Sequence, residues 1–326
     1  MSQMNSDIQG LPGIVTALQK GGVTKTSLGL NIAERLASSS HNVVMIDLDH
    51  DCHLTSLLLD DETEENVLNA ETHIGKAMFG DVPPEELIIE TEFGVDLIPS
   101  TNLMGEVVRR MQTTRLGINR IRNNVVAPLY NGGEGKNTDD DKGYDYFIID
   151  PPGGEGQMLD AAFVAVQRTV IPITPEAGTV NGLARLLERT IRPLQSEVGM
   201  NIEVVAITPN RMYESISRES SEQTIIQNLN DTFKQYLPSY AKVDDDILEA
   251  INTPGETLST IPKPGIRERK AINDAFKSGL PVAEYDPECD QIQHFDELAQ
   301  MIIDSCNPDK TDEHEASKEE EVMANG

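Results

Sequence analysis

The stretch Lys20-Gly21-Gly22-Val23-Thr24-Lys25-Thr26-Ser27 decides how the rest of the chain is interpreted. An apolar run at 14–18 predicts a strand before it, and apolar spacing at 28–37 predicts a helix after it. A glycine-bearing turn between strand and helix presents backbone N–H groups that bind phosphate oxygens, helped by the positive end of the helix. We therefore predict a phosphate-binding loop, with Lys25 at the terminal phosphates and the Thr26 hydroxyl at Mg²⁺.

Two positions of this loop depart from the usual pattern. Thr24 stands where a glycine usually precedes the second lysine, and Lys20 is an additional lysine ahead of the glycine pair. An ordinary glycine-rich turn without a ligand is the alternative, but the flanking strand and helix favour a phosphate loop. The residues predicted to contact the nucleotide here are Gly21, Gly22, Val23, Thr24, Lys25, Thr26 and Ser27.

Apolar runs predict further strands along the chain, at 43–46, 95–99, 146–149, 169–173 and 204–208. Helical spacing predicts helices near 72–79, 102–129, 179–197, 219–236, 265–278 and 290–305. Strands that alternate with helices form crossover units with parallel strands. The predicted fold class is therefore α/β, a doubly wound, mostly parallel sheet with helices on both faces.

Composition predicts one nucleotide-binding domain over residues 11–306, after a flexible N-terminus at 1–10. The glycine-rich, charged stretch 131–143 predicts a mobile loop, and the acidic stretch 307–326 predicts a disordered tail. No window approaches the roughly 18 consecutive apolar residues of a membrane helix. The N-terminus also lacks the apolar core of a secretory signal, so we expect a cytoplasmic protein.

The charge balance is strongly acidic, with 55 acidic against 26 basic residues and a net charge of −29. Such an excess keeps a protein soluble where salt screens its self-repulsion, so we expect a halophilic source, a haloarchaeon. An acidic protein with basic partners is the alternative. Taken alone, this balance argues against nucleic-acid binding.

The three widely spaced cysteines predict neither a disulfide framework nor a paired-cysteine metal site.

Acidic residues follow two other predicted strands. Asp47 and Asp49 come after 43–46, and Asp150 comes after 146–149. The carboxyl ends of parallel strands share one edge of a sheet, so these acids should lie near the phosphate loop. We predict that Asp150 secures Mg²⁺ beside Thr26, that Asp47 lies behind the metal, and that Asp49 orients or polarises the attacking water. A strand-terminal aspartate capping a turn is the alternative for Asp150.

The loop Asp49-His50-Asp51-Cys52-His53 also has the composition of a metal-ligand cluster. Five adjacent candidates on one short loop cannot all face one ion, and closed zinc sites need four convergent ligands. We therefore disfavour a transition-metal site, and the role of residues 50–53 stays open.

From about residue 13 to 304 the chain resembles the ParA-type partition ATPases, the branch of phosphate-loop proteins with a deviant Walker A motif that also holds MinD. Four blocks carry the resemblance in the family's order, namely 20–27, 43–55, 144–152 and 261–287. It implies that Lys20 reaches across a dimer to the partner's nucleotide and that Asp49 matches the hydrolytic aspartate. Lys20, Lys25 and Asp49 are then the catalytic set, while Asn210 and Pro262 resemble parts of the adenine pocket.

The resemblance also implies cofactors and partners. These are ATP and Mg²⁺, a homodimer that sandwiches ATP, nonspecific DNA bound in the ATP state at the nucleoid, and a ParB-like or other small centromere-binding protein that stimulates hydrolysis. The candidates for DNA contact are Arg211, Arg218, Arg267, Arg269 and Lys270. An ordinary solvated charged surface is an equally open interpretation of these residues. We also expect basic clusters at 109–122 and 263–277 to supply a local positive patch.

Two alternative functions use the same fold. A MinD-like positioning ATPase needs a basic amphipathic helix at its C-terminus, and the acidic residues 313–321 disfavour membrane binding. A metabolic ATP-dependent enzyme stays open, because ATP binding does not define the second substrate. The chain also departs from the family at residues 50–53, where the family often has Pro-Gln-Gly-Asn.

Overall fold

A computed structural model describes residues 10–18, 24–132, 143–176, 178–213, 221–252 and 264–307. Within them, six strands form one sheet in the order β3-β2-β4-β1-β5-β6, and every neighbouring pair is parallel. The strands are β1 (Gly13–Thr16), β2 (Val43–Asp47), β3 (Val95–Ile98), β4 (Tyr146–Asp150), β5 (Arg168–Ile173) and β6 (Glu203–Pro209). The predicted α/β class is confirmed. The segments predicted to be mobile, at 1–10, 131–143 and 307–326, lie largely outside the described residues.

The central strands are buried on both faces because they are continuous apolar runs. Every residue of β1, β2, β4 and β5 is buried. The register places Ile148 of β4 beside Ile14 of β1 and Met45 of β2, in the middle of the sheet. Strands of this kind need helices on both sides, since neither face presents polar groups to water.

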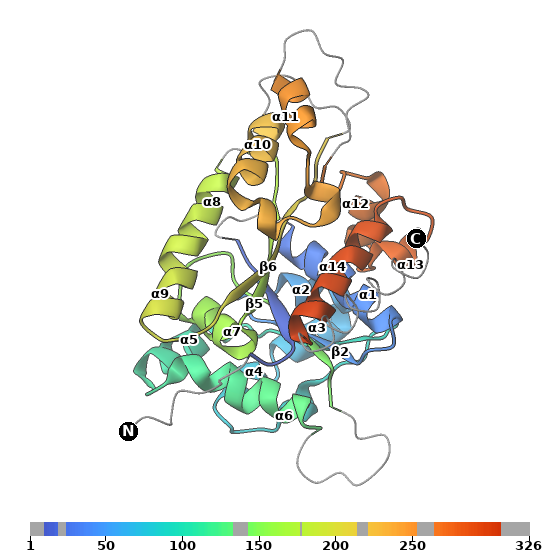
Figure 1. The fold of residues 1–326 in the computed structure, drawn as a ribbon. Coiled ribbons are helices and arrows are strands. Elements are labelled where there is room, and N and C mark those ends of the chain that lie inside the picture. Colours follow the sequence, from blue (N-terminus) through green and yellow to red (C-terminus); the bar gives the residue numbers. More distant parts are fainter. Residues whose placement is uncertain are drawn as a thin grey trace, which may run out of the picture.

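Helices cover the two faces as separate layers (Figure 1). On one face α1 (Lys25–Ser38) packs against α14 (Ile292–Cys306), and on the other lie α5 (Met104–Thr113), α7 (Gln157–Val166) and α8 (Thr179–Arg185). The remaining α-helices of the described residues are α2 (His53–Leu58), α3 (Asp61–Leu68), α4 (Ile74–Met78), α6 (Ala127–Tyr130), α9 (Arg192–Ser196), α10 (Ser221–Phe233), α11 (Asp245–Asn252), α12 (Lys270–Lys277) and α13 (Val282–Tyr285). None of the described helices is long and apolar enough to span a bilayer.

Some of these helices are not predicted by apolar spacing. α7 is buried almost all round, so its sequence shows no polar stripe that would reveal a helical period. α2, α11 and α13 have eight residues or fewer, too short for a clear pattern.

The helix predicted at 102–129 ends at Thr113, before extended Thr114 and left-handed Leu116, and both this segment and the one predicted at 179–197 contain a π-helical turn. Arg122–Val126 precedes α6, and Leu186–Ile191 joins α8 to α9. In both cases the next helix has a proline at its start, Pro128 or Pro193. Proline lacks an N–H and collides with the carbonyl four residues earlier, and a wider π turn relieves that collision.

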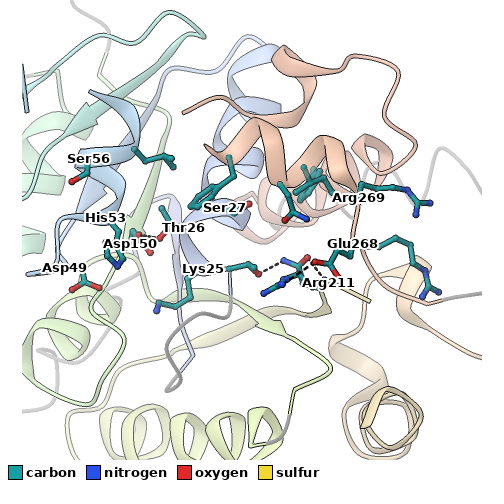
Figure 2. Close-up of a pocket in the computed structure, with 18 residues that line it drawn as sticks. Lys25, Thr26, Ser27, Asp49, His53, Ser56, Asp150, Arg211, Glu268 and Arg269 are labelled. Atoms are coloured by element: carbon teal, nitrogen blue, oxygen red, sulfur yellow. Dashed lines mark hydrogen bonds and ion pairs between the residues drawn. The ribbon is translucent and has the colours of Figure 1, made fainter. Parts of the chain in front are cut away.

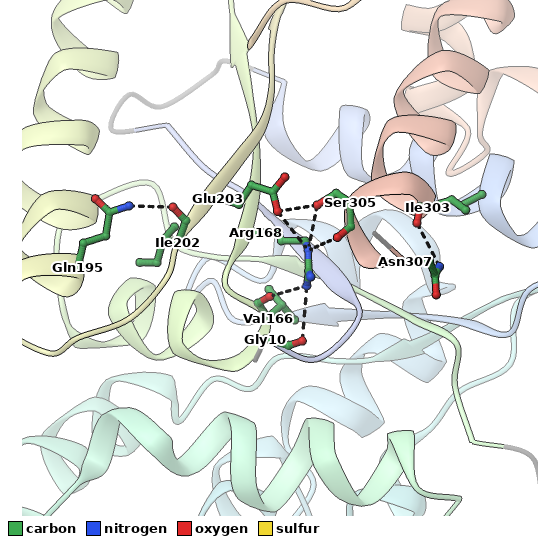
Figure 3. Close-up of polar contacts among 9 residues, drawn as sticks. All are labelled: Gly10, Val166, Arg168, Gln195, Ile202, Glu203, Ile303, Ser305 and Asn307. Atoms are coloured by element: carbon green, nitrogen blue, oxygen red, sulfur yellow. Dashed lines mark hydrogen bonds and ion pairs between the residues drawn. The ribbon is translucent and has the colours of Figure 1, made fainter. Parts of the chain in front are cut away.

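Arg168 connects the first and last described segments of the chain, at the amino-terminal edge of the sheet (Figure 3). Its guanidinium donates to the carbonyl of Gly10 at 3.5 Å, to the carbonyl of Val166 at 3.4 Å and to the Ser305 hydroxyl at 3.0 Å. Glu203 lies 3.6 Å from the same guanidinium and accepts a hydrogen bond from Ser305. Because Arg168 is only 7% exposed, these contacts compensate the burial of its charge.

Candidate functional site

The carboxyl ends of β1, β2 and β4 bring the predicted site residues together. Asp47 ends β2 and Asp150 ends β4, and the two are register partners. Next to them, at the start of α1, is a pocket of about 670 Å³ (Figure 2). The predicted residues that line it are Thr24, Lys25, Thr26, Ser27, Asp49, Asp150, Asn210, Arg211, Arg267 and Arg269. The structure thus brings acids from separate strands to the start of this helix.

Asp150 is a buried carboxyl that receives hydrogen bonds from two hydroxyls. Thr26 Oγ1 donates to Oδ2 at 2.6 Å, and Thr16 Oγ1 donates to Oδ1 at 3.4 Å. Burial raises the pKa of Asp150 to about 7, partly opposed by the Thr26 hydrogen bond. A carboxylate beside a hydroxyl is the oxygen donor set that Mg²⁺ prefers, so Thr26 and Asp150 fit the predicted metal.

Asp47 is fully buried and is not among the residues that line the pocket. Its Oδ2 accepts hydrogen bonds from the backbone N–H of Thr55 at 2.9 Å and from the Thr55 hydroxyl at 2.7 Å. Its Oδ1 accepts from the backbone N–H of Asp49 at 3.0 Å. Burial raises the pKa of Asp47 to about 6, although these hydrogen bonds lower it. In this arrangement Asp47 positions the Asp49 loop and the start of α2.

Asp49 lines the pocket on the loop that follows β2. Its Oδ1 lies 3.0 Å from His50 Nδ1 and accepts a hydrogen bond from the backbone N–H of Asp51 at 3.1 Å. The Ser100 hydroxyl donates to the Asp49 carbonyl at 2.6 Å, which anchors the loop to the end of β3. Asp49 therefore faces the same space as Lys25 and Asp150, as a water-orienting residue would.

The loop does not assemble a closed metal cage within the described residues. Asp49, His50 and Asp51 can bring one ligand atom each within 4.8 Å of one another. Cys52 is buried and directs its thiol to the His50 carbonyl, while His53 lines the pocket. A closed zinc site needs four convergent ligands, so this geometry agrees with the interpretation that disfavours one.

Thr24 has a backbone conformation that is uncommon for its residue type. Its φ is 63°, in the left-handed region, and it precedes the first residue of α1. Its carbonyl accepts the backbone N–H of Leu28 at 2.9 Å, and its hydroxyl accepts Asn210 Nδ2 at 2.8 Å. The glycine usual at this position adopts such a φ without strain, whereas threonine is branched at Cβ.

The rest of the pocket wall consists of residues that, His53 apart, the sequence did not single out as ligands. α2 supplies His53, Ser56 and Leu57; α12 supplies Ile272, Asn273 and Phe276; Glu268 and Phe295 complete the wall. These residue types are ordinary for amphipathic helices, so only their position beside α1 gives them a role. Leu57, Ile272, Phe276 and Phe295 are apolar and make this part of the pocket suited to a flat, partly apolar group.

Five predicted site residues lie outside the described residues: Lys20, Gly21, Gly22, Val23 and Pro262. Their predicted roles in the loop, in the dimer and in the adenine pocket stay predictions. Arg218, one of the candidates for DNA contact, also lies outside.

Arg267 is buried in the structure, which does not fit a contact with a DNA backbone. Its side chain is 5% exposed, lies 3.4 Å from Glu222 and donates to the Tyr213 carbonyl at 2.6 Å. Burial lowers the pKa of Arg267 to about 10. A phosphate on the surface of a duplex cannot reach a guanidinium in this position, so we withdraw Arg267 from the DNA-contact candidates.

The other described candidates for DNA contact each lie beside a carboxylate. Arg211 lies 3.2 Å from Glu268, Arg269 makes two hydrogen bonds to Asp290, and Lys270 lies 2.6 Å from Asp274. These pairs neutralise much of the charge locally. Lys270 has a side chain 90% exposed, so it is the most accessible of the three.

The two basic clusters expected to form one patch lie at different ends of the molecule. α5 and α6, with the cluster at 109–122, are far from α12 in Figure 1. In the first cluster Arg110 lies over the Phe79 ring and pairs with Asp81 at 2.8 Å, while Arg122 donates to the Ala165 carbonyl. The expectation of a single patch is therefore wrong.

Comparison with known proteins adds a family and several relatives. A family model described as an AAA domain matches residues 13–204. The chain is 25% identical over 292 residues to the chromosome partitioning protein ParA of Caulobacter vibrioides, covering 89% of this chain and 93% of that protein. It is 27% identical over 191 residues to the sporulation initiation inhibitor protein Soj of Bacillus subtilis, covering 58% of this chain and 68% of that one.

Solved structures with a similar fold include apo McdA of Cyanthece, with a TM-score of 0.67 and 19% identity over 90% of this chain and 99% of that one. A putative plasmid partition protein of Borrelia burgdorferi bound to AMPPNP has a TM-score of 0.63 and 19% identity, with the same two coverages. These likenesses confirm the predicted phosphate-loop NTPase fold.

Proposed function

Because the chain belongs to the AAA domain family, we propose that it is a ParA-type partition ATPase, which binds ATP with Mg²⁺ in the pocket at the start of α1. The observation that carries this proposal is the hydrogen bond of 2.6 Å between Thr26 and Asp150 at the wall of that pocket. A hydroxyl and a carboxylate that meet beside a lysine at a helix start form the usual Mg²⁺ and phosphate site of this class of ATPase.

Each residue has a part in the proposed reaction. Thr26 and Asp150 hold Mg²⁺, and Lys25 neutralises charge that develops on the transferred phosphoryl group. Asp49 orients the attacking water from the loop that follows β2. Bound Mg²⁺ would supply further charge neutralisation and would keep Asp150 ionised. Adenine occupies the far end, where Asn210, Ile272 and Phe276 line the wall.

The proposed biological role is a dimer switch that moves DNA. Lys20 reaches the partner's nucleotide in an ATP-bound homodimer, and this dimer binds DNA without sequence preference. A ParB-like or other small centromere-binding protein stimulates hydrolysis, which releases the DNA. Relatives named for chromosome or plasmid partition support this role, including ParA of Caulobacter vibrioides. We interpret the net charge of −29 as an adaptation to high salt, under which these assays should be run.

The test measures ATP hydrolysis at high KCl, with Mg²⁺ or EDTA, and with or without duplex DNA. We expect hydrolysis to require Mg²⁺ and DNA binding to require ATP. Light scattering should show a dimer with ATP and a monomer with ADP. No turnover of ATP under any of these conditions would contradict the ATPase. Turnover that appears only with a small metabolite, without DNA binding, would instead indicate a metabolic enzyme on this fold.

A further inference from the structure

Asn210 connects the start of α1, at the phosphate end of the pocket, to the carboxyl end of β5. Its Nδ2 donates to Thr24 Oγ1 at 2.8 Å, and its Oδ1 accepts the backbone N–H of Arg211 at 2.8 Å. Its own backbone N–H donates to the carbonyl of Ile173, the last residue of β5, at 2.7 Å. Asn210 is 7% exposed. The amide thus extends from an anchored backbone to a residue 186 positions earlier in the chain.

Thr24 needs such support because of its backbone angle. At a φ of 63° the Cβ of an L-residue crowds its own backbone, and a branched Cβ makes the crowding worse. A residue in this region keeps its conformation only when its surroundings over-determine it. Thr24 also begins the hydrogen bonding of α1, so its conformation sets the direction in which Lys25 and Thr26 enter the pocket.

We propose that Asn210 is a positioning residue for phosphate binding, because its hydrogen bond holds Thr24 in the left-handed conformation that orients Lys25 and Thr26. The inference rests on the proposed nucleotide site and adds to Asn210 a role separate from its predicted contact with adenine. The role arises in this chain because a threonine hydroxyl is present where a glycine usually stands. A glycine would need no support and would offer Asn210 no partner.

Inorganic tripolyphosphate separates the two roles of Asn210, since it has phosphates but no base. Its affinity is measured by calorimetry with Mg²⁺ for wild type, Asn210→Ala, Thr24→Gly and the double variant. We expect Asn210→Ala to weaken the affinity for tripolyphosphate about three- to tenfold, the usual contribution of one hydrogen bond. In the Thr24→Gly background the same substitution should change the affinity less than about twofold, well below that value.

Two further variants at position 24 separate the effect of the hydroxyl from that of the branched Cβ. Thr24→Ser retains the hydroxyl and should retain the dependence on Asn210, whereas Thr24→Val retains the branched Cβ without the hydroxyl and should bind as weakly as Asn210→Ala. Thermal unfolding of each variant verifies that the fold is intact.

Each outcome separates this inference from the proposed function. If wild type binds tripolyphosphate and Asn210→Ala binds it equally well, Asn210 does not position the phosphate site and the inference is wrong. An equal loss in the wild-type and Thr24→Gly backgrounds would also overturn it, because Asn210 would then act without Thr24. If wild type binds neither tripolyphosphate nor ATP, the proposed function fails, and this inference fails with it.

Discussion

The hydroxyl of Thr26 donates to Oδ2 of Asp150 at 2.6 Å, although the two residues are 124 positions apart in the chain. One belongs to the first turn of α1 and the other ends β4. They meet because β4 pairs with β1 in parallel, so that the end of β4 lies beside the start of α1. This contact is the centre of the proposed Mg²⁺ site.

Removal of the Thr26 hydroxyl should uncouple ATP binding from Mg²⁺. Thr26→Val keeps the shape of the side chain but offers the metal no oxygen, so hydrolysis should fall about 100-fold. The ratio of ATP affinities with and without Mg²⁺ should approach one. Thr26→Ser retains the hydroxyl and serves as the matched control. Equal stimulation by Mg²⁺ in the valine variant would argue against Thr26 as a ligand.

Asp49→Ala should separate hydrolysis from binding. Because Asp49 is proposed to orient water and to leave the metal to other residues, turnover should fall about 100-fold while ATP affinity changes less than about threefold. Single-turnover hydrolysis and calorimetry give the two numbers. His50→Ala on the same loop removes only the neighbouring imidazole and serves as the comparison. A loss of affinity as large as the loss of turnover would instead assign Asp49 to nucleotide or metal binding.

The stability of the protein without metal should fall as pH rises from about 4 to 7. Burial raises the pKa of Asp150 to about 7 and that of Asp47 to about 6, above the 3.8 of an ordinary aspartate. The folded chain therefore binds these protons more tightly than the unfolded chain. Their stabilisation is complete below about pH 4 and is lost as pH passes through the folded values.

Urea unfolding in EDTA and high KCl measures this loss, with salt screening the remaining charges. Asp150→Asn cannot titrate, so the decrease across this window should shrink by on the order of 2 kcal/mol. Asp51→Asn removes one exposed carboxyl from the neighbouring loop and is the control. A decrease of the same size in Asp150→Asn and wild type would refute the assignment.

Arg168 should contribute much more to stability than an exposed arginine. Arg168→Met leaves the carbonyls of Gly10 and Val166 without this buried donor and removes the ion pair with Glu203, which should cost about 2–4 kcal/mol. Arg192, with a side chain 68% exposed, lies 2.6 Å from Glu188, and Arg192→Met should change stability by less than about 1 kcal/mol. Urea unfolding compares the two. Equal effects would mean that the contacts of Arg168 add nothing.

Charge reversal at Arg269 and Lys270 should weaken ATP-dependent DNA binding about tenfold or more, because phosphate contacts dominate nonspecific affinity. The loss should shrink as KCl rises. Arg189→Glu with Arg192→Glu reverses the same charge at another exposed place and is the control. Equal losses in both double variants would indicate an effect of net charge alone. Arg267 is left out, because its reversal would place a second carboxylate beside the buried Glu222.

Local pattern predicted much of the fold and the phosphate end of the site. Each of the six strands contains a short apolar run, and acids that follow parallel strands of this kind lie at one edge of the sheet. The same reasoning failed for α7, which shows no polar stripe. It also failed for the long helices at 102–129, which breaks at Thr114–Leu116, and at 179–197, which contains a π-helical turn. It also misjudged Arg267, since a buried and an exposed arginine look alike in sequence.

The sequence by itself determined the α/β class and the meeting of Thr26, Asp49 and Asp150, because the alternation of strands with helices and the motif context are encoded in short segments. Only the tertiary structure decided that Arg267 lies in the interior beside Glu222. The same holds for helix side chains such as Phe276, which line the pocket, and for the hydrogen bond from Asn210 to Thr24. Each of these depends on which surfaces pack together across long separations. Packing of that kind leaves no period or spacing in the chain, so it becomes visible only when the sheet and its helices are assembled.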